Sequence, residues 1–213
     1  GVVTSDSRME IFLPPAVRSQ AGQILQEHFS TIPPLLVALH PGGSEPYKRW
    51  PLEQFAALGK QLHESYQASF LIISSTAERE LAQTLADRIG APALVSGGRF
   101  ELLTVAGLLS HCQLFVGNDS GPLHLALALQ VPSIGLLGAD HPRRIGPYQV
   151  DWGVSLYKHE ACPRNPCTTR RCPRPRCLEA IAPEEVLGLV QQWWAPQFFH
   201  NLVKGALHDG RLA

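Results

Sequence analysis

The sequence predicts an α/β fold of the Rossmann-like type, in which a parallel sheet is covered by helices on both faces. Short apolar runs of strand length alternate with segments of helical spacing between residues 35 and 195. Such alternation is typical of βαβ units. The runs are almost continuously apolar, which is expected of strands that are buried on both sides. With 213 residues, the chain is long enough for one sizeable domain with a core of its own.

The elements follow one another in a regular order. We expect strands at 35–39, 70–73, 93–95, 114–116, 133–137 and 154–157, and an additional short strand at 9–13. We expect helices at 17–29, 51–66, 78–89, 100–112, 120–130 and 183–194, where apolar residues recur three or four positions apart. The chain is divided into a lead-in or interdomain segment at 1–34, the α/β domain at 35–195 with a Cys- and Arg-rich loop at 159–178, and a C-terminal tail at 196–213.

Charge and composition exclude several classes of protein. The 18 Lys and Arg residues balance the 18 Asp and Glu residues, so no nucleic-acid-binding surface is expected. No apolar run approaches the length of a transmembrane helix. The N-terminus lacks the basic and apolar regions of a signal peptide, so a cytoplasmic protein is expected. The first residue is Gly1 rather than Met, so we expect either an engineered chain or an excised part of a longer one.

The segment 117–124 joins an expected strand to an expected helix, at the end of the sheet where ligands bind. Asp119 or Ser120 is a suitable N-cap for that helix. The backbone N–H groups of Ser120 and Gly121 are then available to an anion, which the helix dipole favours. His124 lies one turn into the helix and reaches the same place. The spacing fits equally well a capped helix in which His124 is a buried hydrogen-bonding residue.

A second candidate site follows the first expected strand of the domain. The turn at 40–44 contains two glycines, and successive N–H groups in such turns can bind an anion, here at Gly43 and Ser44. Lys48 follows four residues later, where its ammonium group would stabilise the charge left on a departing diphosphate. The alternative is that Lys48 is a solvated lysine before a helix.

These loops are part of a longer pattern. It comprises 40–44 (HPGGS), 48–51 (KRWP), 116–126 (VGNDSGPLHLA), 131–132 (VP), 138–148 (GADHPRRIGPY), 177–181 (CLEAI) and 183–186 (PEEV). The pattern resembles the signature of the heptosyltransferase family, glycosyltransferases that build the inner core of lipopolysaccharide. The resemblance implies the C-terminal, donor-binding half of a two-domain GT-B enzyme. The N-terminal half of such enzymes binds the acceptor and supplies the general base, so this chain alone is expected to be inactive.

The resemblance also implies the ligand and the residue roles. The donor would be an ADP-sugar, ADP-heptose by family, and the acceptor a lipopolysaccharide inner core. Lys48 would contact the donor phosphates and be the catalytic residue of this half. Gly43, Ser44, Ser120, Gly121 and His124 would surround the donor. No cofactor is implied, and transfer is expected to be independent of metal.

Two carboxylates are given separate roles. A carboxylate next to a diphosphate would repel it, so Asp119 is expected to accept hydrogen bonds from sugar hydroxyls. The resemblance implies that a glutamate after the second strand contacts the ribose hydroxyls. Glu78 aligns best with that glutamate and Glu80 is the alternative, although both also fit the first turn of a helix, where acids complement the dipole.

Two other functions remain open. Another GT-B enzyme, such as a sugar-nucleotide epimerase, would need the same nucleotide contacts. A stand-alone nucleotide-binding module without catalysis would need only this half of the enzyme.

Four cysteines, Cys162, Cys167, Cys172 and Cys177, are spaced five apart, with Arg164, Arg170, Arg171, Arg174 and Arg176 among them. The spacing differs from that of the common structural zinc sites, so we expect structural thiols, reduced or disulfide-linked, rather than a metal site. The arginines would face either an anionic acceptor, the surface of the inner membrane, or only solvent.

Overall fold

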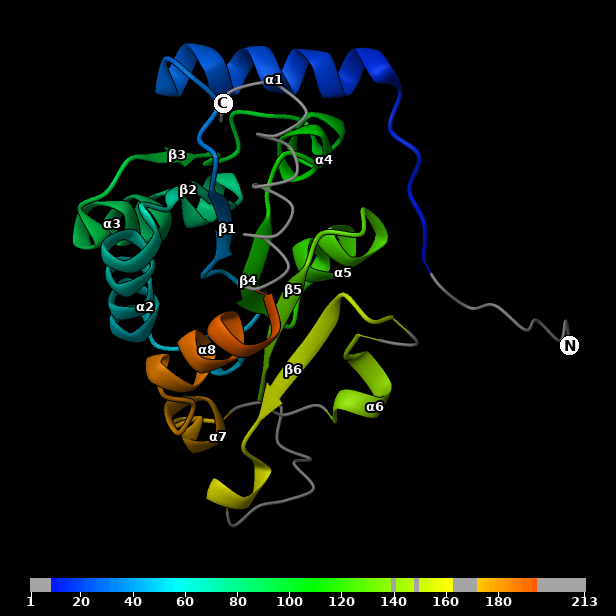
Figure 1. The fold of residues 1–213 in the computed structure, drawn as a ribbon. Coiled ribbons are helices and arrows are strands. Elements are labelled where there is room, and N and C mark those ends of the chain that lie inside the picture. The colour runs from blue at the N-terminus through cyan, green and yellow to red at the C-terminus, as the bar shows by residue number, and fades with distance from the viewer. Residues whose placement is uncertain (1–8, 139–140, 148–149, 163–171, 195–213) are drawn as a thin grey trace, which may run out of the picture.

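The computed structural model describes residues 9–138, 141–147, 150–162 and 172–194 (Figure 1). In these ranges, six strands form one parallel sheet in the order β3-β2-β1-β4-β5-β6. The strands are β1 (Leu36–His40), β2 (Ser69–Ile72), β3 (Ala93–Val95), β4 (Leu114–Asn118), β5 (Ser133–Leu137) and β6 (Gly153–Tyr157). The predicted parallel sheet is therefore confirmed, and its order places β1 and β4 side by side at the centre.

Helices cover both faces of the sheet (Figure 1). One face carries α1 (Pro15–Phe29), α4 (Leu102–Leu109) and α5 (Gly121–Ala128), and the other carries α2 (Leu52–Tyr66), α3 (Arg79–Ile89) and α8 (Pro183–Leu189). The sequence did not predict the short helices α6 (Pro142–Ile145) and α7 (Arg176–Glu179). No helix in the described ranges is long and apolar enough to span a membrane.

The central strand β1 shows why both faces need a cover. Val37 and Leu39 pack into the core cluster beneath α2, α3 and α8, whereas Leu36 and Ala38 pack into the cluster beneath α1, α4 and α5. Successive side chains of a strand point to opposite faces, so an apolar strand must be covered twice. Burying a leucine fully stabilises the fold by about 1.5–3 kcal/mol.

The N-terminal part of the chain differs from the prediction. Residues 9–13 form no strand, and the Ile11 N–H donates to the Ala128 carbonyl at 3.1 Å. Both neighbours of every inner strand are already taken, and the stretch runs beside α5 rather than along a sheet edge. By contrast, the expected helix at 17–29 is present as α1, which packs on α4 and buries Ala21 and Leu25 completely.

Several helix boundaries also differ. The expected helix from residue 78 begins instead with a 3-10 turn, Thr76–Glu78, before α3. The last helix is α-helical only to Leu189 and continues as a π-helical turn, Val190–Trp194. The predicted tail at 196–213 lies outside the described residues.

Candidate functional site

A cavity of about 880 Å³ lies at the carboxyl ends of the central strands. It is lined from four loops: those after β1, β2 and β3, and the one at the start of α5. Six of the eight predicted site residues line it: Gly43, Ser44, Glu78, Ser120, Gly121 and His124. The segment around Ile11 and the apolar residues Phe100 and Val105 complete much of the remaining wall. The topology thus brings loops that are far apart in sequence to one place.

The other two predicted residues, Lys48 and Asp119, form an ion pair next to that cavity. Nζ of Lys48 donates to Oδ2 of Asp119 at 3.2 Å, and both side chains are mostly buried. Nε2 of His124 lies 4.0 Å from the other Asp119 oxygen. The 3-10 turn Pro46–Lys48 places the lysine there. The pair therefore joins the loop after β1 to the loop after β4.

Glu78 lines the cavity while also holding the loop after β1. One of its oxygens accepts from the Gly43 N–H at 2.9 Å, and the other accepts from the Ser75 N–H and hydroxyl at 3.1 and 2.9 Å. Burial alone would raise the pKa of Glu78, but these hydrogen bonds to its charged form outweigh burial and lower the pKa. Of the two acids considered for ribose binding, Glu78 lines the cavity and Glu80 does not.

The start of α5 is not capped as predicted. Ser120 occupies the N-cap position with extended backbone, but its side chain makes no cap bond and its hydroxyl donates to the Asn118 carbonyl at 3.0 Å. The Asp119 side chain is directed to Lys48 instead, because that cation offers a stronger, charge-assisted partner. A Cβ added at Gly121 would meet no heavy atom within 4 Å. The helix N-terminus therefore opens onto free space beside the cavity.

Sequence reasoning missed two residues that shape this site. Asn118 is completely buried; its amide donates to the Pro41 and Gly42 carbonyls, and its oxygen accepts from the Trp50 N–H. Arg49 donates to the Gly43 carbonyl from two nitrogens. Asn118 could have been found from the sequence, because it is a polar residue at the end of an apolar strand. The position of Arg49 beside Lys48 gave no such signal.

His40 is, like Asn118, a buried polar residue of the site, and it lies at the end of β1. Its Nδ1 donates to the Ile73 carbonyl at 2.9 Å, and the side chain lines the cavity. Burial lowers the pKa of His40. The hydrogen bond to Ile73 and the charge of Glu78 raise it, but they only partly oppose the effect of burial. The His40 side chain thus links the end of β1 to the residue that follows β2.

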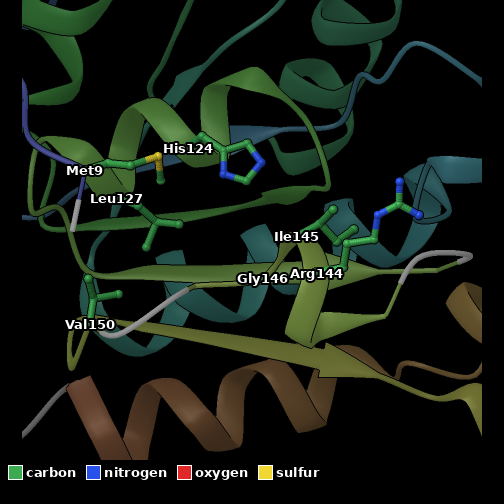
Figure 2. Close-up of a pocket in the computed structure, with 7 residues that line it drawn as sticks. All are labelled: Met9, His124, Leu127, Arg144, Ile145, Gly146 and Val150. Atoms are coloured by element: carbon green, nitrogen blue, oxygen red, sulfur yellow. The ribbon is translucent and has the colours of Figure 1, made fainter. Parts of the chain in front are cut away.

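A smaller cavity of about 250 Å³ lies on the other side of His124. Figure 2 shows the His124 ring between Met9 and Leu127 on one side and the α6 residues Arg144 and Ile145 on the other. Met9 and His124 line both cavities. His124 thus stands where the two spaces meet.

The cysteine segment is only partly described. Cys162 and Cys172 are reduced thiols, whereas Cys167 lies outside the described residues together with Arg164, Arg170 and Arg171. Cys177 is half-buried in α7. No group of three metal-ligating side chains occurs in the described part of the chain. Arg174 pairs with Glu179 at 3.2 Å, and this ion pair is exposed.

The fold and the cavity at the carboxyl ends of its strands define a Rossmann-like α/β domain with a candidate ligand site. Residues 16–176 match the model of glycosyltransferase family 9 (heptosyltransferase). The chain belongs to that family.

Two curated relatives illustrate the match. Lipooligosaccharide heptosyltransferase 2 of Campylobacter jejuni is 25% identical over 158 residues, which cover 71% of this chain and 49% of that protein. Lipopolysaccharide heptosyltransferase 1 of Pseudomonas aeruginosa is 33% identical over 142 residues, 65% of this chain and 38% of that protein. The chain spans about half the length of the curated relatives it matches first.

Solved structures share the fold. The family 9 glycosyltransferase of Veillonella parvula superposes with a TM-score of 0.75 at 24% identity, over 89% of this chain and 55% of that one. E. coli ADP-heptose LPS heptosyltransferase II gives 0.70 at 20% identity, over 88% and 54%. E. coli heptosyltransferase WaaC with ADP gives 0.59 at 23% identity, over 79% and 48%.

Proposed function

We propose that this domain binds ADP-heptose, and that the protein containing it transfers the heptose to an acceptor of the lipopolysaccharide inner core. The observation that carries the proposal is the convergence of six predicted donor-binding residues on one cavity at the carboxyl ends of the strands. Membership of the heptosyltransferase family supports the sugar and the acceptor. The E. coli heptosyltransferase WaaC is described with ADP and with ADP-2-deoxy-2-fluoro heptose, which supports the nucleotide.

The cavity and the adjoining Lys48–Asp119 pair offer the ribose, the diphosphate and the sugar of the donor chemically suitable partners. Glu78 can accept from one ribose hydroxyl with the lone pair that its bonds to Gly43 and Ser75 leave. The diphosphate would lie between Ser44 and the open N-terminus of α5 at Ser120 and Gly121, where the helix dipole favours an anion. The heptose would then extend beyond the diphosphate toward Asp119 and His124.

Lys48 is the residue we assign to catalysis in this domain. Its ammonium group is paired with Asp119 and stands beside the proposed diphosphate position. Negative charge grows on the departing ADP during transfer, and a fixed cation stabilises that transition state more than the ground state. With Lys48 and the helix N-terminus supplying positive charge, we propose that no metal ion is required.

Titration calorimetry of the domain tests this proposal. The domain is titrated with ADP, UDP and GDP, each with and without magnesium. We expect ADP to bind more tightly than UDP and GDP, with a dissociation constant that magnesium leaves within about twofold. Equal affinity for the three nucleotides would refute the choice of adenine, and binding that appears only with magnesium would refute the metal-independent site.

A further inference from the structure

The loop 41–44 has its first three carbonyl oxygens engaged by side chains. The Asn118 amide donates to the carbonyls of Pro41 and Gly42 at 3.0 and 2.8 Å. Arg49 donates to the Gly43 carbonyl from Nε at 3.0 Å and from Nη2 at 2.7 Å. Four hydrogen bonds from two side chains therefore fix three successive peptide groups.

The opposite edge of the same loop is held by Glu78. Its carboxylate accepts from the Gly43 N–H and lies 3.8 Å from Arg49. It also lies so close to Gly42 that a Cβ at that position would overlap it. Gly43 is thus held from both sides, its N–H by a carboxylate and its carbonyl by a guanidinium group.

The direction of these carbonyls matters for an anion. A phosphate is stabilised by N–H groups and repelled by carbonyl oxygens, and a glycine-containing turn can present either by rotating its peptides. A loop already held in one orientation does not lose that rotational freedom when a ligand binds. Donors that occupy the carbonyl oxygens therefore prepare the loop for a phosphate at Ser44, because the Gly43 N–H, also predicted to bind an anion, is taken by Glu78.

We propose that Asn118 and Arg49 are positioning residues, which hold the loop 41–44 in the orientation that receives the donor diphosphate. The inference rests on the proposed function of the cavity. Asn118 is completely buried, and neither residue lines the cavity, so both act through the loop carbonyls. The two nitrogens of Arg49 on a single carbonyl form a geometry that lysine cannot reproduce.

The first experiment separates the phosphate from the rest of the nucleotide. Arg49→Ala is titrated with ADP and with adenosine, beside a control, Arg88→Ala, whose guanidinium pairs with Glu53 on the exposed surface of α2 and α3. We expect Arg49→Ala to weaken ADP binding about tenfold or more and adenosine binding by less than about twofold, with the control like the parent. Equal losses for ADP and adenosine, or no loss, would overturn the proposal.

The second experiment separates positioning from direct attraction of charge. Hydrogen exchange of the amides at 42–45 is followed without any ligand. We expect Arg49→Ala and Arg49→Lys to exchange faster there than the parent, with the melting temperature little changed, and Arg49→Lys to recover little ADP affinity. Unchanged exchange, or full recovery of ADP affinity in Arg49→Lys, would show that Arg49 acts by charge alone.

Asn118→Asp provides a separate test of the buried amide. The new carboxylate keeps an acceptor for Trp50 but opposes two carbonyl oxygens, so we expect faster exchange at 42–45 and ADP binding at least about tenfold weaker. Unchanged exchange and affinity would contradict the role of Asn118. If this variant does not fold, the Arg49 variants decide the matter. A parent that binds no ADP would refute the proposed function, while the ligand-free exchange measurement would still show whether Arg49 holds the loop.

Discussion

The loop after β1 and the loop after β4 face the same cavity but are built in different ways. The first is tied at every peptide from Pro41 to Gly43, by Asn118, Arg49 and Glu78. The second leads into α5 without a side-chain cap and leaves open space at Gly121. The conformation of the loop after β1 is fixed by surrounding side chains, whereas the orientation of the loop after β4 is set by the helix α5 that it begins. The proposed diphosphate site therefore combines a held turn with an uncapped helix end.

The two loops meet at the Lys48–Asp119 pair. The pair places a cation and a carboxylate within one part of the site, so their effects on a ligand are coupled. Substitutions in each loop should therefore show how far the two loops differ in rigidity and how far they act together on a ligand.

The largest effect is expected from Gly42→Ala, because the added Cβ would overlap the Glu78 carboxylate and so displace it from its hydrogen bonds to Gly43 and Ser75. We expect the free energy of unfolding to fall by about 1–3 kcal/mol, as for other overpacked positions. Urea unfolding measures it. Gly121→Ala is the matched control in the open loop: its Cβ meets nothing, and alanine is favoured in a helix by up to about 1 kcal/mol. Equal destabilisation by both substitutions would remove the contrast between the loops.

Lys48→Ala tests the coupling of the two loops. We expect ADP binding to weaken by about 1–3 kcal/mol, through loss of a charge-assisted hydrogen bond. The loss includes repulsion from Asp119, which no longer has its cation. The double variant Lys48→Ala/Asp119→Asn should therefore bind ADP more tightly than Lys48→Ala alone. If adding Asp119→Asn to Lys48→Ala improves ADP binding in calorimetry by no more than Asp119→Asn does alone, the pair does not act as a unit.

Asp119→Asn distinguishes a sugar-binding role from a role limited to the ion pair. If Asp119 accepts from sugar hydroxyls, the variant should bind ADP-heptose roughly tenfold less well, while ADP binding stays equal or improves because a nearby negative charge is gone. The measurement is a pair of dissociation constants for parent and variant. Equal changes for both ligands would refute the sugar-hydroxyl role.

The smallest effect concerns His40, whose folded-state pKa lies below its ordinary value of 6.5 because it is buried. The unfolded chain then binds the proton more readily than the folded protein. The contribution of His40 to the free energy of unfolding is therefore fully present above pH 6.5 and is lost as the pH drops below that value. One proton contributes at most about 1.4 kcal/mol per pH unit. Glu78, whose pKa is lowered from 4.5, contributes a separate loss that begins below that pH. His40→Gln should flatten the slope of stability against pH between pH 6.5 and about 5; an unchanged slope would show that other groups cause it.

The order of strands and helices along the chain could be predicted because the formation of each element depends on its local sequence pattern. Buried strands such as the one predicted at 35–39 are continuous apolar runs, and helices such as α2 repeat apolar residues at helical spacing. The segment 9–13 has a strand-like sequence, but a strand forms only where the segment lies along a sheet edge. Tertiary packing places this segment beside α5 instead, which the local pattern does not reveal. The short helices α6 and α7 have only four residues each, too few for a periodic signal.

The sequence by itself determined which loops carry the site, because parallel strands place all their carboxyl ends at one edge. Glycines, Lys48, Asp119 and His124 after apolar runs were therefore recognisable as candidates. Only the tertiary structure decided the partners: Lys48 with Asp119, Glu78 with Gly43, and Asn118 with the carbonyls of Pro41 and Gly42. These contacts join residues 35 to 77 positions apart. A hydrogen bond tolerates a change of only a few tenths of an ångström in the distance between donor and acceptor. The packing of β1 against β2 and β4 sets these distances, and the local sequence does not.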